Sequence, residues 1–194
     1  MRVLAPLLLA LAACPGPQPY PCVVGDLTQP PELQLVYRDA NGAMMPLANG
    51  AMVPLTRAPQ GGHIMLVSVR VKNAQLCDAT LQAALKDPCT GRVAGLEGRP
   101  ITWTIAADGF AEPQSPMELS DYANLAVCPA ANNTREIDGA PWKLEVKLYQ
   151  SGGASIDQTI DVTPSCDVSS DPESCRCECR FDCTSTVDAG VPSC

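Results

Sequence analysis

Three segments of the chain alternate apolar and polar residues with the period of two that a half-buried β-strand requires. They cover residues 64–72, 142–149 and 156–163, and each places its apolar side chains on one face. The glycine-containing residues 151–155 separate the last two segments and can supply the positive φ angles of a turn. We therefore expect one strand over 64–72 and an antiparallel hairpin made by the other two segments.

Weaker strand patterns occupy residues 33–37 and 101–106. Residues 79–86 are ambiguous, because Leu81 and Leu85 fit both a helical spacing and an alternating strand, and the strand interpretation is favoured. Many turn signals and hardly any helical pattern accompany these strands. The pattern predicts a mainly-β fold, an antiparallel β-sandwich over residues 32–165.

The strand spacing resembles that of immunoglobulin-like domains, in which a cysteine, a core tryptophan and a second cysteine follow one another along the chain. Cys89 and Trp103 have a comparable spacing. Tyr122 lies six residues before Cys128, farther than the tyrosine of that family, and Cys128 follows the tryptophan too closely. The resemblance implies an immunoglobulin-like sandwich without the disulfide of that family.

A short repeat occurs at residues 41–48 and 49–56, and each copy begins with Asn-Gly, a pair that tolerates the positive φ angles of tight turns. We expect a short hairpin or an edge excursion, because Pro46 and Pro54 lack a backbone donor for further strand pairing. The alternative is a binding surface lined by methionines. Its residues would be Met44, Met45 and Met52.

The chain is acidic and poor in aromatic side chains. Its formal net charge is −8 at pH 7, which excludes nucleic-acid binding, because that function relies on Lys and Arg at phosphates. Aromatic residues make up 4% of the chain, so the core must come mainly from Val, Leu, Ile, Ala and Met. Disulfides worth about 2–4 kcal/mol each would reinforce such a core.

Residues 1–13 have the features of a secretory leader: Arg2, a short apolar run and a small-residue cleavage site. The run is shorter than the roughly 20 residues that a membrane-spanning helix needs. The tetrapeptide Leu11-Ala12-Ala13-Cys14 resembles the lipobox of bacterial lipoproteins. The resemblance implies cleavage before Cys14 and a membrane anchor of fatty acyl chains, such as palmitate, at that residue. The alternative is an ordinary signal peptide that leaves Cys14 as a structural thiol.

Pro15 stands where lipoproteins of the inner membrane generally carry Asp, so the resemblance implies an outer-membrane location, on the periplasmic side or at the cell surface. Residues 14–31 begin with repeated prolines and are expected to form a stiff tether. A proline-rich ligand for another domain is the alternative for this segment.

The chain has 11 cysteines, and without Cys14 the remaining 10 can all pair in an oxidising periplasm. The disulfide candidates are Cys22, Cys77, Cys89 and Cys128 in the tether and body, and Cys166, Cys175, Cys177, Cys179, Cys183 and Cys194 in the tail. Their connectivity stays open at the level of the sequence.

Residues 166–194 form a cysteine-rich tail with few apolar side chains, and we expect irregular structure held by cross-links. A thiolate site for zinc or copper(I) in residues 175–183 is the alternative. Asp167, Asp171 and Glu173 could hold calcium loosely, but they lack the spacing of a calcium loop and are expected to be solvated charges.

The single histidine, His63, is expected to lie exposed in a turn, and no catalytic or phosphate-binding motif accompanies it. The sequence therefore predicts a lipoprotein without enzymatic activity or cofactor, which serves as a structural, adhesion or partner-binding module for a protein or glycan. The alternative is an exported enzyme or metal-binding protein that uses the tail cysteines.

Overall fold

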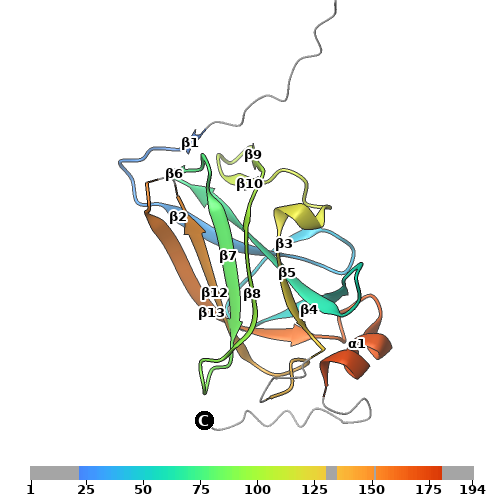
Figure 1. Ribbon diagram of the computed structural model, residues 1–194. Coiled ribbons are helices and arrows are strands. Elements are labelled where there is room, and N and C mark those ends of the chain that lie inside the picture. The colour runs from blue at the N-terminus through green and yellow to red at the C-terminus, as the bar shows by residue number, and fades with distance from the viewer. Residues whose placement is uncertain (1–21, 130–134, 151, 181–194) are drawn as a thin grey trace, which may run out of the picture.

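The computed structural model describes residues 22–129, 135–150 and 152–180, and β-strands dominate these ranges (Figure 1). The expected leader 1–13, Cys14, the first part of the tether 14–31, and the cysteines Cys183 and Cys194 lie outside the described residues.

The strands fall into two groups that one strand joins. The first group comprises β2 (Glu32–Arg38), β3 (Met44–Pro46), β5 (His63–Lys72), β9 (Trp103–Ile105), β10 (Ala111–Pro113) and β11 (Ala123–Cys128). The second group comprises β7 (Thr80–Lys86), β8 (Val93–Pro100), β12 (Trp142–Tyr149) and β13 (Ser155–Ser165). The joining strand, β4 (Ala51–Arg57), pairs antiparallel with β5 and parallel with β13.

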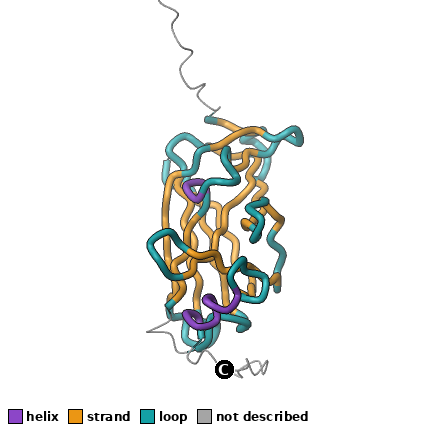
Figure 2. Tube along the Cα trace, turned by 90° about the vertical axis from the view of Figure 1, so that its right-hand side faces the viewer, coloured by secondary structure: helices purple, strands orange, loops and turns teal. Residues whose placement is uncertain are grey.

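Three smaller elements complete the fold. The strands β1 (Val23–Val24) and β6 (Ala74–Gln75) form a separate antiparallel ribbon. The short 3-10 helix η1 (Leu119–Asp121) precedes β11, and the α-helix α1 (Pro172–Cys179) follows β13. Figure 2 shows the strands running along the long axis of the body, with α1 at one end, and Figure 1 places β1 and β6 at the opposite end.

The two strand groups enclose one hydrophobic core, as in a sandwich. The inward face of β5 contributes Met65, Val67, Val69 and Val71, all fully buried, and β12 contributes Leu144, Val146 and Leu148. The alternation read from the sequence thus matches the side chains that fill the core, which confirms the mainly-β, sandwich-type fold.

The second contact between the groups lies between β8 and β11, on the side away from β4. The backbone N–H of Asn124 in β11 donates a hydrogen bond to the carboxylate of Glu97 in β8. Gly95 of β8 lies so close to β11 that an added Cβ would sit 2.9 Å from the carbonyl oxygen of Ala126. The body is therefore braced on both sides of the core.

Several predicted elements are confirmed. The hairpin of β12 and β13 pairs Trp142 with Val162 and Tyr149 with Ser155, and Gly152 takes a positive φ in its turn. The ambiguous segment 79–86 is the strand β7. The segment predicted over 101–106 shortens to β9, and β4, β8 and β11 were not predicted.

The short repeat has two different structures. Its first copy contains the end of the turn after β2 and the edge strand β3, which pairs with β2 as an edge hairpin, as expected. Its second copy contains most of β4, which lies between β5 and β13, so the expectation of an edge excursion is wrong for this copy. Pro54 lies opposite Ser165 in the parallel pairing of β4 with β13. Pro54 has no backbone N–H, but its carbonyl oxygen can still accept a hydrogen bond from a neighbouring strand.

The tail cysteines are tied to the body. Cys166 is bonded to Cys175, and Cys179 is bonded to Cys128 of β11. The body and tail cysteines therefore do not pair as separate sets. The described part of the tail is not wholly irregular, because it forms α1, whose residues Cys175 and Cys179 are buried in the main core.

Candidate functional site

The clearest cluster of titratable side chains surrounds His63, which is 0% exposed at the first position of β5. Its Nδ1 lies 2.7 Å from Oε2 of Glu178, and its Nε2 lies 3.1 Å from Oδ1 of Asp171. A carboxylate only accepts hydrogen bonds, so both bonds form at once with a doubly protonated ring, or with a neutral ring beside one protonated carboxyl group. The cluster is thus a charged junction between β5 and α1.

The expectation of an exposed turn histidine is wrong. His63 is in phase with Met65 and Val67, so the strand points its ring toward the interior. Had the alternation of the strand been extended by one step toward the N-terminus, it would have placed the histidine on the inward face. The tail then covers the ring, and no local signal in the sequence indicates that contact.

Asp171 is the residue immediately before α1, but its side chain does not cap the helix. Although partial burial opposes ionisation, the hydrogen bond from His63 and the bond from the Ser169 hydroxyl hold the pKa of Asp171 below its usual value. The guanidinium of Arg57 lies 3.6 Å from its other oxygen. These contacts hold the start of α1 against β4 and β5.

The same cluster contains atoms that ligate metals. The ring of His63 and the sulfurs of Cys175 and Cys179 lie within 4.8 Å of one another, and all three residues are buried. Both sulfurs are oxidised, one in a bond with Cys166 and the other in a bond with Cys128. A disulfide sulfur lacks the thiolate charge that zinc or copper(I) requires, so this group could bind a metal only after reduction.

The acidic residues considered for calcium point to other partners. Asp167 forms an ion pair with Arg176, and Asp171 accepts the bond from His63. Glu173 is exposed in the first turn of α1. The structure therefore does not bring these three carboxylates together as a set of oxygen ligands.

The methionine surface is divided. Met52 is 58% exposed and lines an open hollow of about 500 Å³ together with Tyr37, Pro54 and Val168. Met44 and Met45 lie on the edge strand β3 and do not line this hollow. The three methionines thus do not form one continuous binding site.

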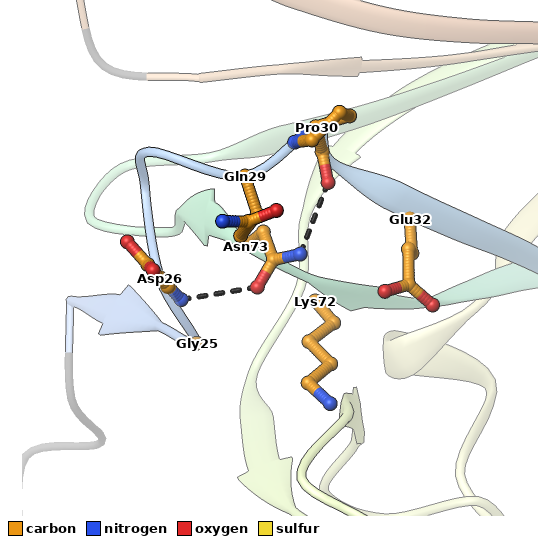
Figure 3. A pocket seen from close by; sticks show the side chains of 7 residues that line it. All are labelled: Gly25, Asp26, Gln29, Pro30, Glu32, Lys72 and Asn73. Atoms are coloured by element: carbon orange, nitrogen blue, oxygen red, sulfur yellow. Dashed lines mark hydrogen bonds between the residues drawn. The ribbon is translucent and has the colours of Figure 1, made fainter.

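A second open hollow, of about 610 Å³, lies at the end of the body where β1 begins. Figure 3 shows the loop of residues 25–30 folded over Asn73, whose side chain accepts a hydrogen bond from the backbone N–H of Asp26 and donates one to the carbonyl of Pro30. Lys72 and Glu32 also line the hollow. No sequence motif pointed to this hollow.

The remaining disulfide candidates are accounted for in part. Cys22 is bonded to Cys77 beside the ribbon of β1 and β6. Cys89 is also oxidised, and Cys177 is exposed on α1. Cys14, Cys183 and Cys194 lie outside the described residues.

Comparison with known proteins identifies no relative. No protein-family description, no curated protein and no solved structure matches the chain. Among the described residues, neither helix has the length and apolar character needed to cross a membrane.

Proposed function

We propose that this chain is an exported bacterial lipoprotein, anchored through an acylated Cys14, that presents a disulfide-braced β-sandwich as a binding or structural module outside the cytoplasm. The anchor is proposed on the lipobox-like residues 11–14. The outer membrane is the proposed location, and a protein or glycan is the proposed class of partner.

One observation carries the proposal: three disulfides cross-link the described part of the chain. Two of them have a sequence separation above fifty residues, and Cys166, Cys175 and Cys179 are fully buried. Bonds of this kind form and persist in oxidising compartments and are rare in the cytoplasm. An oxidised body directly after a leader-like segment supports export.

The anchor is tested by detergent phase partitioning of the expressed protein with and without Cys14→Ser. The wild-type chain should enter the detergent phase and incorporate labelled palmitate, because two or three acyl chains give lasting attachment. The Cys14→Ser chain should stay in the aqueous phase. Cys22→Ser is the matched control, since it removes a nearby cysteine and should leave partitioning unchanged. Equal partitioning of the wild-type and Cys14→Ser chains would refute the anchor.

A metal-binding function is the second candidate, because His63, Cys175 and Cys179 converge. Native mass spectrometry without reductant separates the two proposals. The lipoprotein module should show all 10 cysteines other than Cys14 oxidised and no bound metal. Free thiols at Cys175 and Cys179 together with a bound zinc or copper ion would favour the second candidate.

A further inference from the structure

The described chain begins with Cys22 and β1, at the end of the body that carries β1, β6, β9 and β10 (Figure 1). Cys14 and Cys22 are eight residues apart. Even a fully extended chain of that length spans at most about 30 Å. A body anchored through Cys14 therefore keeps this end close to the bilayer, and α1 lies at the far end.

Large apolar side chains are exposed at this near end without a partner to cover them. Val23 in β1 is 43% exposed, Leu27 in the following loop is 53% exposed, and Ile105 in β9 is 41% exposed. Exposed apolar groups beside an anchor are suited to the boundary between headgroups and acyl chains.

The hollow at this end is lined by one cation, Lys72, and by two carboxylates, Asp26 and Glu32. The Asp26 carboxylate accepts hydrogen bonds from the backbone N–H and the hydroxyl of Thr28, whereas Lys72 and Glu32 do not pair with each other. Glu32 and Lys72 lie directly opposite in the pairing of β2 and β5, and both line the hollow (Figure 3). Neither side chain forms an ion pair within the described part of the chain. The ammonium group of Lys72 lies 5.8 Å from the centre of the Phe110 ring.

We propose that this end is a membrane-contact face for zwitterionic phospholipid. The exposed apolar residues enter the interfacial layer, while Lys72 binds the phosphate and Glu32 the ammonium of one phosphoethanolamine headgroup in the hollow. Because Thr28 engages the Asp26 carboxylate, the two charged groups of the hollow without a hydrogen-bond partner among the described residues are Lys72 and Glu32, and their opposite charges match those of that headgroup. This inference rests on the proposed anchor, and it adds a fixed orientation of the body on the membrane.

The test uses the lipidated full chain in vesicles of phosphatidylethanolamine and phosphatidylcholine, with hydrogen exchange measured at the backbone amides of residues 26–29. Exchange should be slower by about fivefold or more than in the Cys14→Ser chain in buffer, because the membrane covers the loop. Exchange in α1, at the far end, should be equal in the two samples.

Single substitutions distinguish the membrane-contact face, which slows exchange at residues 26–29, from the lipid anchor, which makes the chain sediment with vesicles. Lipidated Leu27→Ser should still sediment with vesicles but lose most of the slowing at 26–29, whereas Met52→Ser, which removes a side chain of similar exposure at a different site, should keep it. Lys72→Gln and Glu32→Gln should each reduce the slowing, and full slowing in both would overturn the headgroup assignment.

A wild-type chain that sediments with vesicles but shows no slowing overturns the contact face and leaves the anchor intact. A chain that carries no lipid and does not sediment overturns both.

Discussion

His63 joins segments of the chain that lie more than one hundred residues apart in the sequence. Its ring is fully buried, whereas the carboxylates of Asp171 and Glu178 keep about a third of their side-chain surface exposed. The ring thus bonds to two carboxylates at the rim of the core. Burial of its two polar nitrogens is tolerated because each has one of these carboxylates as a hydrogen-bond partner.

His63→Ala should lower the free energy of unfolding by about 1–3 kcal/mol, because it removes the ring that bonds to two partly buried carboxylates. Denaturant titration measures the change. The control is Lys143→Ala, which breaks an exposed ion pair with Asp161 and should cost no more than about 1 kcal/mol. Equal effects of the two variants would show that the buried junction contributes no more than a surface pair.

Asp171 should make stability depend on pH in the acid range. Its pKa lies below the ordinary value of 3.8 in the folded chain, so the unfolded chain takes up the proton first as the pH falls. The stabilising contribution is complete well above pH 3.8 and is lost as the pH falls through the lower, folded value.

The unfolding free energies of wild type and Asp171→Asn, measured between pH 7 and pH 2, isolate this contribution. Their difference should be constant near neutral pH and should shrink below about pH 4. Other carboxylates with lowered pKa values, such as Glu145, titrate in both chains and cancel in the difference. A difference that stays constant down to pH 2 would contradict the assignment.

At the scale of elements, β8 depends on a glycine at the point where it meets β11. Gly95→Ala places a methyl group 2.9 Å from a backbone carbonyl oxygen and 3.0 Å from a methyl group of Val127, and the backbone cannot yield without moving the strand. We expect a loss of about 1–3 kcal/mol in the free energy of unfolding.

Gly98 provides the matched control within the same strand. An added Cβ there meets nothing closer than 3.8 Å, which is ordinary contact. Gly98→Ala should be neutral or stabilising by up to about 1 kcal/mol, because it removes the backbone freedom of a strand glycine. Thermal unfolding of Gly95→Ala and Gly98→Ala measures the two changes in stability. Similar losses of stability would mean that the close approach of β8 to β11 is not present in solution.

The helix α1 is an element that cross-links hold in place. It has 8 residues, far fewer than the roughly 12–15 that a helix needs to persist alone in water. Replacing Cys128 and Cys179 together by Ala should lower the free energy of unfolding by about 2–4 kcal/mol and release the amides of α1 to fast hydrogen exchange. Replacing Cys22 and Cys77, at the other end of the body, should leave exchange in α1 unchanged.

At the scale of the whole molecule, β4 makes the two strand groups one folding unit, because it is hydrogen-bonded to both. Trp103 lies in the first group and Trp142 in the second, and both are almost fully buried. Trp103→Phe and Trp142→Phe leave one fluorescent reporter in each group.

Urea titration of each single-tryptophan chain should give a midpoint that coincides with the circular dichroism transition of the same chain, as expected for two-state unfolding. The two chains need not have equal midpoints, since each substitution has its own cost. Fluorescence and circular dichroism transitions that separate within one chain would show that the strand groups unfold independently.

The predictable part of this protein lies in its strands with a clear period of two. The central strands of both groups were predicted, because one face of each strand must be apolar to fill a core. They lie within residues 64–72, 79–86 and 142–163. β8 was missed because Gly95 and Gly98 interrupt its pattern, and β4 because Pro54 argued against a paired strand. The candidate site was missed because it forms between His63 and a tail more than one hundred residues away.

What the sequence determined by itself was local: the alternation that makes this chain mainly β, the turn at residues 151–155, and the cysteine content that predicted cross-links. Tertiary structure alone decided that Cys179 reaches Cys128, that the described tail folds as a helix over His63, and that Glu32 and Lys72 meet unpaired in one hollow. The physical reason is the distance along the chain between the residues that interact. Strand periodicity depends on neighbours a few residues apart, whereas disulfide pairing and charge clusters depend on which distant segments the closed core brings together.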